Sequence, residues 1–252
     1  KIYLRSLYCS MIDTQTNRLE GKKALVTGGT RGIGSAIARE LHNLGSSVTI
    51  TGTKPSFSSD DYQYLCSNFE KMDSLYELVE TVKYLQIDIL INNAGINQIG
   101  PISELKVSDF NRVQQVNVTA PFMLSQVVLP GMREKKWGRI VNISSIWGKI
   151  SKELRAPYSA SKFAIDGLTA ATSAEVAVDG VLVNSVAPGF IDTELTREVL
   201  GVKEMEKLAF QVPIKRVGTP KEIAKFVGWL AGPDNTYISG QNIAIDGGFS
   251  RV

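Results

Sequence analysis

The chain has 252 residues, of which 43% are hydrophobic and 21% are charged, the composition of an ordinary globular protein. A formal net charge of +3, without any run of like charges, argues against a nucleic-acid or membrane surface. One histidine and two cysteines nearly exclude a histidine-rich metal site, a Ser-His-Asp triad and a disulfide framework, and they fit a reducing cytoplasmic setting.

The first 18 residues have no clear place in a fold. Their apolar stretch is short and is broken by Arg5, so they do not form a convincing signal peptide. No stretch elsewhere is long and apolar enough to span a bilayer. We interpret residues 1–18 as an N-terminal extension outside the fold and residues 19–252 as a single domain.

Short apolar runs typical of strands alternate with helical patterns along the whole chain. The sequence predicts strands over residues 24–27, 48–51, 88–92, 139–143, 181–186 and 242–245, with a weak one over 64–67. A helix over residues 33–44 places Ile33, Ile37 and Leu41 on one face. This alternation predicts an α/β fold: one doubly wound parallel sheet of the Rossmann type with about seven strands, which binds ligands at the carboxyl ends of its strands.

The connection after the second strand departs from this pattern. Its sequence, TKPSFSSDDY (53–62), consists largely of turn-forming residues where a full crossover helix would normally stand. We therefore expect a surface loop or a short irregular helix here.

A glycine-rich segment, TGGTRGIGSAIA (27–38), joins the first strand to the first helix. Gly28, Gly32 and Gly34 lack Cβ atoms, so the backbone can turn sharply and approach a pyrophosphate closely. The helix that follows presents its free N–H groups and the positive end of its dipole to the phosphates. The segment therefore predicts a dinucleotide site rather than a merely flexible turn.

The end of the second strand indicates which dinucleotide is bound. An NAD site usually carries an acid there for the ribose 2′-hydroxyl, but residues 51–54 read Thr-Gly-Thr-Lys and the first acid is Asp60. Arg31, Thr53 and Lys54 could instead face a 2′-phosphate. The sequence favours NADP(H) over NAD(H), although Lys54 has the alternative of being a solvated loop lysine.

Tyr158 and Lys162 stand four residues apart at a predicted helix start, directly after Pro157, and so share one face of the helix. A nearby cation favours the phenolate and lowers the pKa of a tyrosine, which would make Tyr158 a general acid or base. An ordinary surface pair is the alternative that these two residues alone leave open.

Taken together, the motifs resemble those of short-chain dehydrogenases/reductases over nearly all of residues 19–252. They follow the family's order: TGGTRGIG (27–34), NNAG (92–95), Asn117, SS (144–145), YSASK (158–162) and PG (188–189). The resemblance implies that Tyr158 donates a proton to the substrate carbonyl and that Lys162 lowers its pKa and binds the nicotinamide ribose. It further implies that Ser145 hydrogen-bonds the carbonyl and that Asn117 holds a water linked to Lys162.

The expected cofactor contacts follow from the glycine-rich segment and from this resemblance. Asn68 stands where relatives often have an aspartate near the adenine, which is a mild departure. The expected contacts are Gly28, Thr30, Arg31, Gly32, Ile33, Gly34, Thr53, Lys54, Asn68, Phe69, Asn93, Ala94, Gly95, Tyr158, Lys162, Pro188, Gly189, Ile191 and Thr193.

Within the family, the segments TPKEIA (219–224) and YISGQNIAIDGG (237–248) are most similar to 3-oxoacyl-[acyl-carrier-protein] reductases of fatty acid biosynthesis. This similarity implies NADPH-dependent reduction of a 3-oxoacyl thioester to a 3-hydroxyacyl thioester. Lys135 and Lys136 could form part of a patch that binds the acidic carrier, but Asp179 stands where relatives often carry an arginine. A sugar, polyol or other small-ketone oxidoreductase is the alternative, and an inactive NADP(H)-binding sensor or scaffold is a more remote one.

The resemblance also implies an oligomer. Family members commonly pair through the helices that lead up to Arg133 and start at Tyr158, with added contacts through the last strand. The apolar segment 164–172 fits a helix that is covered on more than one side. We expect a homotetramer or, failing that, a dimer.

Overall fold

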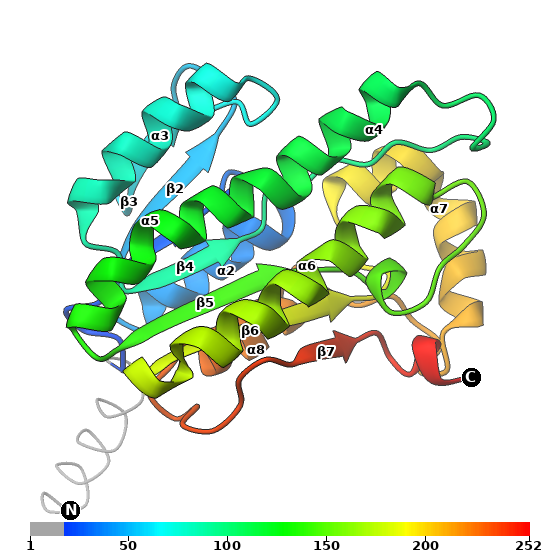
Figure 1. The fold of residues 1–252 in the computed structure, drawn as a ribbon. Coiled ribbons are helices and arrows are strands. Elements are labelled where there is room, and N and C mark those ends of the chain that lie inside the picture. The colour runs from blue at the N-terminus through cyan, green and yellow to red at the C-terminus, as the bar shows by residue number, and fades with distance from the viewer. Residues whose placement is uncertain (1–17) are drawn as a thin grey trace, which may run out of the picture.

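The computed structural model describes residues 18–252, apart from some side chains between residues 195 and 203 (Figure 1). Residues 1–17, and with them nearly all of the predicted N-terminal extension, lie outside the described residues. Leu19 is buried, and its backbone N–H donates to the carbonyl oxygen of Leu44 at 2.7 Å. Arg18 forms an ion pair with Asp234. The described chain is therefore packed against the domain from its first residues.

A single parallel sheet of seven strands forms the centre of the molecule, in the order β3-β2-β1-β4-β5-β6-β7. This confirms the predicted doubly wound Rossmann sheet. From β1 the strands add outward on one side to β3, and β4 then pairs with β1 on its other side, so the strand order reverses there. Ligands of such sheets bind beside this switch point. The strands are β1 (Lys23–Val26), β2 (Ser47–Gly52), β3 (Tyr62–Cys66), β4 (Ile89–Asn92), β5 (Gly138–Ile143), β6 (Val181–Pro188) and β7 (Asn242–Ile245).

Helices cover both faces of the sheet (Figure 1). One face carries α2 (Gly32–Asn43) and α8 (Pro220–Leu230). The other face carries α3 (Met72–Leu85), α5 (Ala120–Glu134) and α6 (Ala156–Val176), while α4 (Val107–Gln114) leads into α5 through the π-helix η1 (Gln115–Thr119). Helix α7 (Glu194–Gln211) lies beyond the carboxyl ends of the strands. The short 3-10 turns are η2 (Ile146–Gly148), η3 (Ala177–Asp179) and η4 (Phe249–Arg251).

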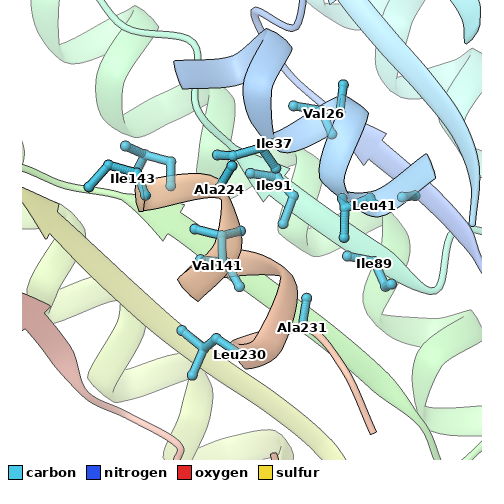
Figure 2. Close-up of a cluster of buried hydrophobic side chains, with 14 of the residues drawn as sticks. Val26, Ile37, Leu41, Ile89, Ile91, Val141, Ile143, Ala224, Leu230 and Ala231 are labelled. Atoms are coloured by element: carbon cyan, nitrogen blue, oxygen red, sulfur yellow. The ribbon is translucent and has the colours of Figure 1, made fainter. Parts of the chain in front are cut away.

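Two hydrophobic cores lie on the two faces of the sheet. Figure 2 shows the first, in which Ile37 and Leu41 of α2 pack with Ile89 and Ile91 of β4. Ile37 and Leu41 are spaced by four residues and so lie one above the other on the helix, as the predicted apolar face required. Each such side chain contributes about 1.5–3 kcal/mol when fully buried.

The connection between β2 and β3 contains no helix, which confirms the predicted surface loop. The two strands are parallel, with Val48 opposite Tyr62. The ring of Phe57 in this loop lies 5.6 Å from that of Tyr64 on β3. The loop therefore supplies a small apolar contact where a crossover helix would otherwise cover the sheet.

Candidate active site

One cavity of about 850 Å³ lies at the carboxyl ends of the strands. Its walls come from the loops after the first six strands and from the first turns of α2, α6 and α7. Nearly all of the predicted site residues line it; among them only Lys54 and Asn117 do not. Those that do are Gly28, Thr30, Arg31, Gly32, Ile33, Gly34, Thr53, Asn68, Phe69, Asn93, Ala94, Gly95, Ser145, Tyr158, Lys162, Pro188, Gly189, Ile191 and Thr193.

The glycine-rich segment forms a tight turn at the start of α2. A Cβ atom on Gly34 would lie 2.3 Å from the carbonyl oxygen of Gly28, so any larger residue here would push the turn apart. Gly28 has a φ of +64°, a left-handed conformation that favours glycine. Arg31 caps the helix without a side-chain hydrogen bond, and the first turn contains no acid. The N–H groups at this end are thus available to an anion such as a pyrophosphate.

The side chain of Asn93 braces this turn from the end of β4. Its amide nitrogen donates to the carbonyl oxygens of Thr27 at 2.9 Å and Gly28 at 3.2 Å. The hydroxyl of Thr27 accepts the backbone N–H groups of Asn93 at 2.9 Å and Ala94 at 3.0 Å. The loops after β1 and β4 are therefore held together at the switch point of the sheet.

At the end of β2, the cavity is lined by Thr53 but not by Lys54. Lys54 is exposed, and its carbonyl oxygen accepts a hydrogen bond from the hydroxyl of Tyr64. The prediction that Lys54 contacts the cofactor stays a prediction, and its exposed position fits the alternative of a solvated loop lysine. Arg31 and Thr53 remain as the polar side chains that could face a ribose 2′-phosphate.

A buried chain of hydrogen bonds joins α6 to the sheet. Asn92 of β4 donates to Asn142 of β5 at 2.8 Å, and Asn142 donates to Thr169 of α6 at 2.9 Å. The hydroxyls of Thr169 and Ser185, which lies on β6, are 2.6 Å apart. These hydrogen bonds fix α6 against the sheet. The helix begins at Ala156, with Pro157 in its first turn, and so places Tyr158 at the cavity.

Ser145, Tyr158 and Lys162 meet in the cavity below this helix start. The Ser145 hydroxyl oxygen accepts the backbone N–H of Trp147 at 3.2 Å, and its own hydrogen points toward the phenol of Tyr158, with which it forms a hydrogen bond. The Lys162 ammonium lies 5.5 Å from the centre of the Tyr158 ring and donates to the carbonyl oxygen of Ile143 at 2.7 Å. The structure thus brings the two residues of the predicted pair together.

The protonation of the pair differs from what the resemblance implied. Burial raises the pKa of the Tyr158 phenol, and hydrogen bonding to Ser145 and the charge of Arg155 only oppose this increase. Burial also lowers the pKa of Lys162 to about 8. In the folded chain by itself, burial outweighs the neighbouring charges and the Lys162 ammonium is bound to Ile143, so the pKa of Tyr158 is not lowered as the resemblance implied.

Asn117 lies in the π-helix η1 behind the cavity wall, where it is buried. Its amide nitrogen donates to the carbonyl oxygen of Ile96 and to the hydroxyl of Ser161, and its oxygen accepts the N–H of Ile96, all at 2.9 Å. Both amide hydrogens are used, so only a remaining lone pair of the oxygen could hold the water that the resemblance implies. Asn117 thus fastens the loop after β4 to α6.

Several charged residues that line the cavity were not predicted. Arg112 of α4 forms an ion pair at 3.2 Å with Glu70, which lies in the loop after β3. Arg155 lies three residues before Tyr158, directly before α6. This spacing in the sequence could have indicated a cation close to Tyr158. The unpredicted charged residues are Glu70, Arg112, Arg155 and Glu194.

Two further features bear on the kind of site. Among residues 18–252, no three His, Cys, Asp or Glu side chains form a group that could hold a metal ion. In the same part of the chain, no helix is long and apolar enough to cross a membrane.

The sequence of residues 22–202 matches the short chain dehydrogenase family, and the chain belongs to this family. The fold and the cavity agree with this assignment, which makes the protein an NAD(P)-dependent oxidoreductase.

Relatives of this chain have several assigned activities. The 3-oxoacyl-[acyl-carrier-protein] reductase FabG of Vibrio cholerae is 39% identical over 93% of this chain and 99% of its own length. A proposed gluconate dehydrogenase from Agrobacterium tumefaciens has a TM-score of 0.86 at 31% identity, over 93% of this chain and 98% of its own. A proposed NAD(P)-dependent gluconate 5-dehydrogenase from Beutenbergia cavernae, whose structure contains NADP, has a TM-score of 0.87 at 30% identity, over 92% of this chain and 97% of its own.

Proposed function

We propose that the protein is an NADPH-dependent carbonyl reductase that resembles 3-oxoacyl-[acyl-carrier-protein] reductases. The observation that carries this proposal is the single cavity that joins the glycine-rich turn to Ser145, Tyr158 and Lys162. The identity to the Vibrio cholerae reductase over nearly the whole of both chains supports the choice of a 3-oxoacyl thioester as substrate.

The chain's own residues can carry out the proton chemistry of ketone reduction. Bound NADPH would supply the hydride. Ser145, whose hydroxyl hydrogen-bonds Tyr158, would donate its hydrogen to the substrate carbonyl oxygen and stabilise the charge that develops there. Tyr158 would donate the proton, and its raised pKa keeps the phenol protonated and ready to do so at neutral pH.

NADP(H) is the proposed cofactor rather than NAD(H). The end of β2 offers Thr53 and no carboxylate that would repel a 2′-phosphate, and Arg31 lines the same cavity. The NADP in the Beutenbergia cavernae structure is in keeping with this choice.

Binding of an acidic carrier has less support than the reaction itself. Lys135 lies 2.8 Å from the carboxylate of Asp88, and Lys136 lies 2.6 Å from that of Asp179. Arg133 also pairs with Asp179, at 3.3 Å. The predicted basic patch is thus largely neutralised within the chain. This favours the second candidate, an oxidoreductase of sugars, polyols or small ketones, to which the gluconate dehydrogenases also point.

The proposed setting is cytoplasmic, as the low cysteine content suggests. The proposed assembly is a homotetramer or a dimer. The outward side chains of Phe110 on α4, Phe122 on α5 and Phe163 on α6 are all more than two-fifths exposed, and such a surface usually marks an interface.

An NADPH-oxidation screen tests the function and separates its two forms. The panel should contain acetoacetyl thioesters, keto-sugars and simple ketones, each with wild-type protein and with Tyr158→Phe as the background control. Faster turnover of the thioesters supports the 3-oxoacyl assignment, and faster turnover of keto-sugars supports the second candidate. A folded wild-type protein that binds NADPH but reduces none of them would instead be a sensor or scaffold.

A further inference from the structure

Arg155 occupies an unusual position at the start of α6. It is the residue directly before the helix, partly buried, and it lines the same cavity as Ser145 and Tyr158. The preceding residue, Leu154, has a φ of +64°, which is costly for a residue with a branched side chain. The carbonyl oxygen of Leu154 accepts the N–H of Gly100 at 3.1 Å, which holds this turn in place. The strained turn places Arg155 at the cavity.

Among the described side chains, no carboxylate at the cavity is paired with Arg155. Glu70 and Arg112 pair with each other, and Lys162 is bound to a backbone carbonyl. Within the described part of the chain, no carboxylate forms an ion pair with the guanidinium of Arg155. The charged side chains that line the cavity are Arg31, Glu70, Arg112, Arg155, Lys162 and Glu194.

A partly buried cation without a partner is unfavourable, and a bound anion would offset this cost. Arg155, directly before α6, and Tyr158, in its first turn, both line the cavity. A substrate whose ketone faces Tyr158 would therefore bring its neighbouring groups to Arg155. A guanidinium can hold a carboxylate or a phosphate through two parallel hydrogen bonds.

We propose that Arg155 is a specificity residue that binds an anionic oxygen group of the substrate, a carboxylate or a phosphate, close to the reacting carbonyl. This inference rests on the proposed carbonyl reductase function. It makes oxo acids or phosphorylated keto-sugars the preferred substrate class. A 3-oxoacyl thioester offers Arg155 only a neutral carbonyl oxygen, so the inference favours the second candidate function.

A different role for Arg155 predicts a different pattern. If its charge acted only on the phenol of Tyr158, removal of the guanidinium would slow every ketone equally, through kcat. If it binds the substrate, its removal raises KM for anionic ketones far more than it affects neutral ketones, which lose only the influence of its charge on Tyr158. Matched pairs of substrates therefore distinguish the two roles.

The test uses NADPH oxidation with two pairs of ketones that differ only in charge. The pairs are acetoacetate with its ethyl ester, and fructose 6-phosphate with fructose. The proteins are the wild type, Arg155→Ala, Arg155→Lys and, as a control, Lys152→Ala, which removes an exposed charge from the same loop. We expect wild-type kcat/KM to favour the anionic member of one pair by about tenfold or more, the effect of one good charge-assisted contact.

Arg155→Ala should remove this preference through KM, Arg155→Lys should retain part of it, and Lys152→Ala should keep it. The pair that responds identifies a carboxylate or a phosphate as the group bound. Equal use of charged and neutral ketones by the wild type, or an equal loss for both in Arg155→Ala, would overturn the inference.

If no ketone is turned over, the proposed reduction of these ketones is contradicted. A direct binding measurement then tests whether Arg155 binds the anionic substrate group. Calorimetric titration of acetoacetate and fructose 6-phosphate into NADP⁺-loaded wild type and Arg155→Ala should show binding that depends on Arg155. No binding, or equal affinity in both proteins, contradicts the role of Arg155. If thermal melting shows that Arg155→Ala does not fold, Arg155→Gln takes its place.

Discussion

At the residue scale, burial dominates the pKa values of the proposed catalytic pair, Tyr158 and Lys162. Lys162 is only 4% exposed, and its ammonium donates to the carbonyl oxygen of Ile143, so its charged form has lost most of its hydration. The phenol of Tyr158 resists ionisation for the same reason. The site thus holds a protonated tyrosine beside a lysine whose pKa, about 8, lies close to neutrality.

Tyr158→Phe removes one hydroxyl and leaves the packing of the ring almost unchanged. We expect turnover of the best ketone to fall by about 10²–10⁴, the usual loss with a general acid, while Tm and NADPH affinity hardly change. Stopped-flow turnover, thermal melting and fluorescence titration measure the three quantities. Tyr84→Phe, on the exposed face of α3, is the matched control and should leave all three unchanged. Near-normal ketone reduction by a folded Tyr158→Phe protein contradicts the mechanism.

Lys162→Met should change how stability depends on pH. Between pH 8 and about 10, the unfolded chain still holds the proton of Lys162 while the folded chain has lost it. Stability contributed by this group therefore rises with pH in the wild type, and the buried methionine has no such dependence.

Urea unfolding at pH 7 and pH 10 measures this effect. The free energy of unfolding of the wild type should gain up to about 3 kcal/mol relative to Lys162→Met between these pH values. Lys152→Met, which replaces an exposed lysine, should follow the wild type. A constant difference between wild type and Lys162→Met across this range would show that Lys162 is not a buried, uncompensated cation.

At the scale of elements, the short connection between β2 and β3 shapes the cofactor end of the cavity. Without a crossover helix, side chains of β3 hold the turn after β2. The Tyr64 hydroxyl donates to the carbonyl oxygen of Lys54, and the Cys66 thiol donates to the carbonyl oxygen of Thr53 at 3.9 Å. This turn presents Thr53 to the cavity and leaves Lys54 outside it. We therefore expect cofactor preference to depend on Arg31, in the loop after β1, more than on Lys54 in this turn.

The expected preference is at least tenfold tighter binding of NADPH than of NADH, equivalent to about 1.4 kcal/mol. Arg31→Ala should reduce this ratio, because Arg31 lines the cavity and can pair with a 2′-phosphate. Lys54→Ala should retain the ratio, because Lys54 does not line the cavity. Fluorescence titrations with both nucleotides check this, and equal affinities of the wild type for them would reject NADP(H) as the preferred cofactor.

At the scale of the whole molecule, one outer surface differs from the rest. Apart from Glu175 near its end, the exposed positions of α6 are occupied by small or apolar residues, and exposed aromatic side chains of α4 and α5 extend this surface. Phe163 is 47% exposed at its centre, and a Cβ atom on Gly167 would meet no other atom within 4 Å. A second copy of the chain could approach this helix closely. The exposed apolar residues of this surface are Phe110, Phe122, Phe163, Ala164, Ala170, Ala171 and Ala174.

Phe163→Glu should therefore weaken the proposed oligomer, because it places a charge in an apolar contact. Light scattering at micromolar concentration should give a tetramer or dimer for the wild type and a smaller species for Phe163→Glu. Tyr84→Glu, on the exposed surface of α3, should assemble like the wild type. A monomeric wild type would refute the assembly.

The sequence by itself determined the order of the strands along the chain, the doubly wound sheet and the glycine-rich turn. These features depend on local patterns: alternating apolar runs, a helical period, and glycines directly after a strand. The π-helix at Asn117 and the bounds of α6, which begins at Ala156, are details that such patterns do not contain.

Only the tertiary structure decided which charges act in the site. Lys54 lies outside the cavity, Lys136 is paired with Asp179, and Arg155 lies beside Tyr158 with no carboxylate of the described residues paired to it. Each of these facts depends on burial and on partners brought together from distant parts of the chain. The pKa of a side chain and the availability of its charge depend on these through-space surroundings, which the residue type and its spacing in the sequence do not specify.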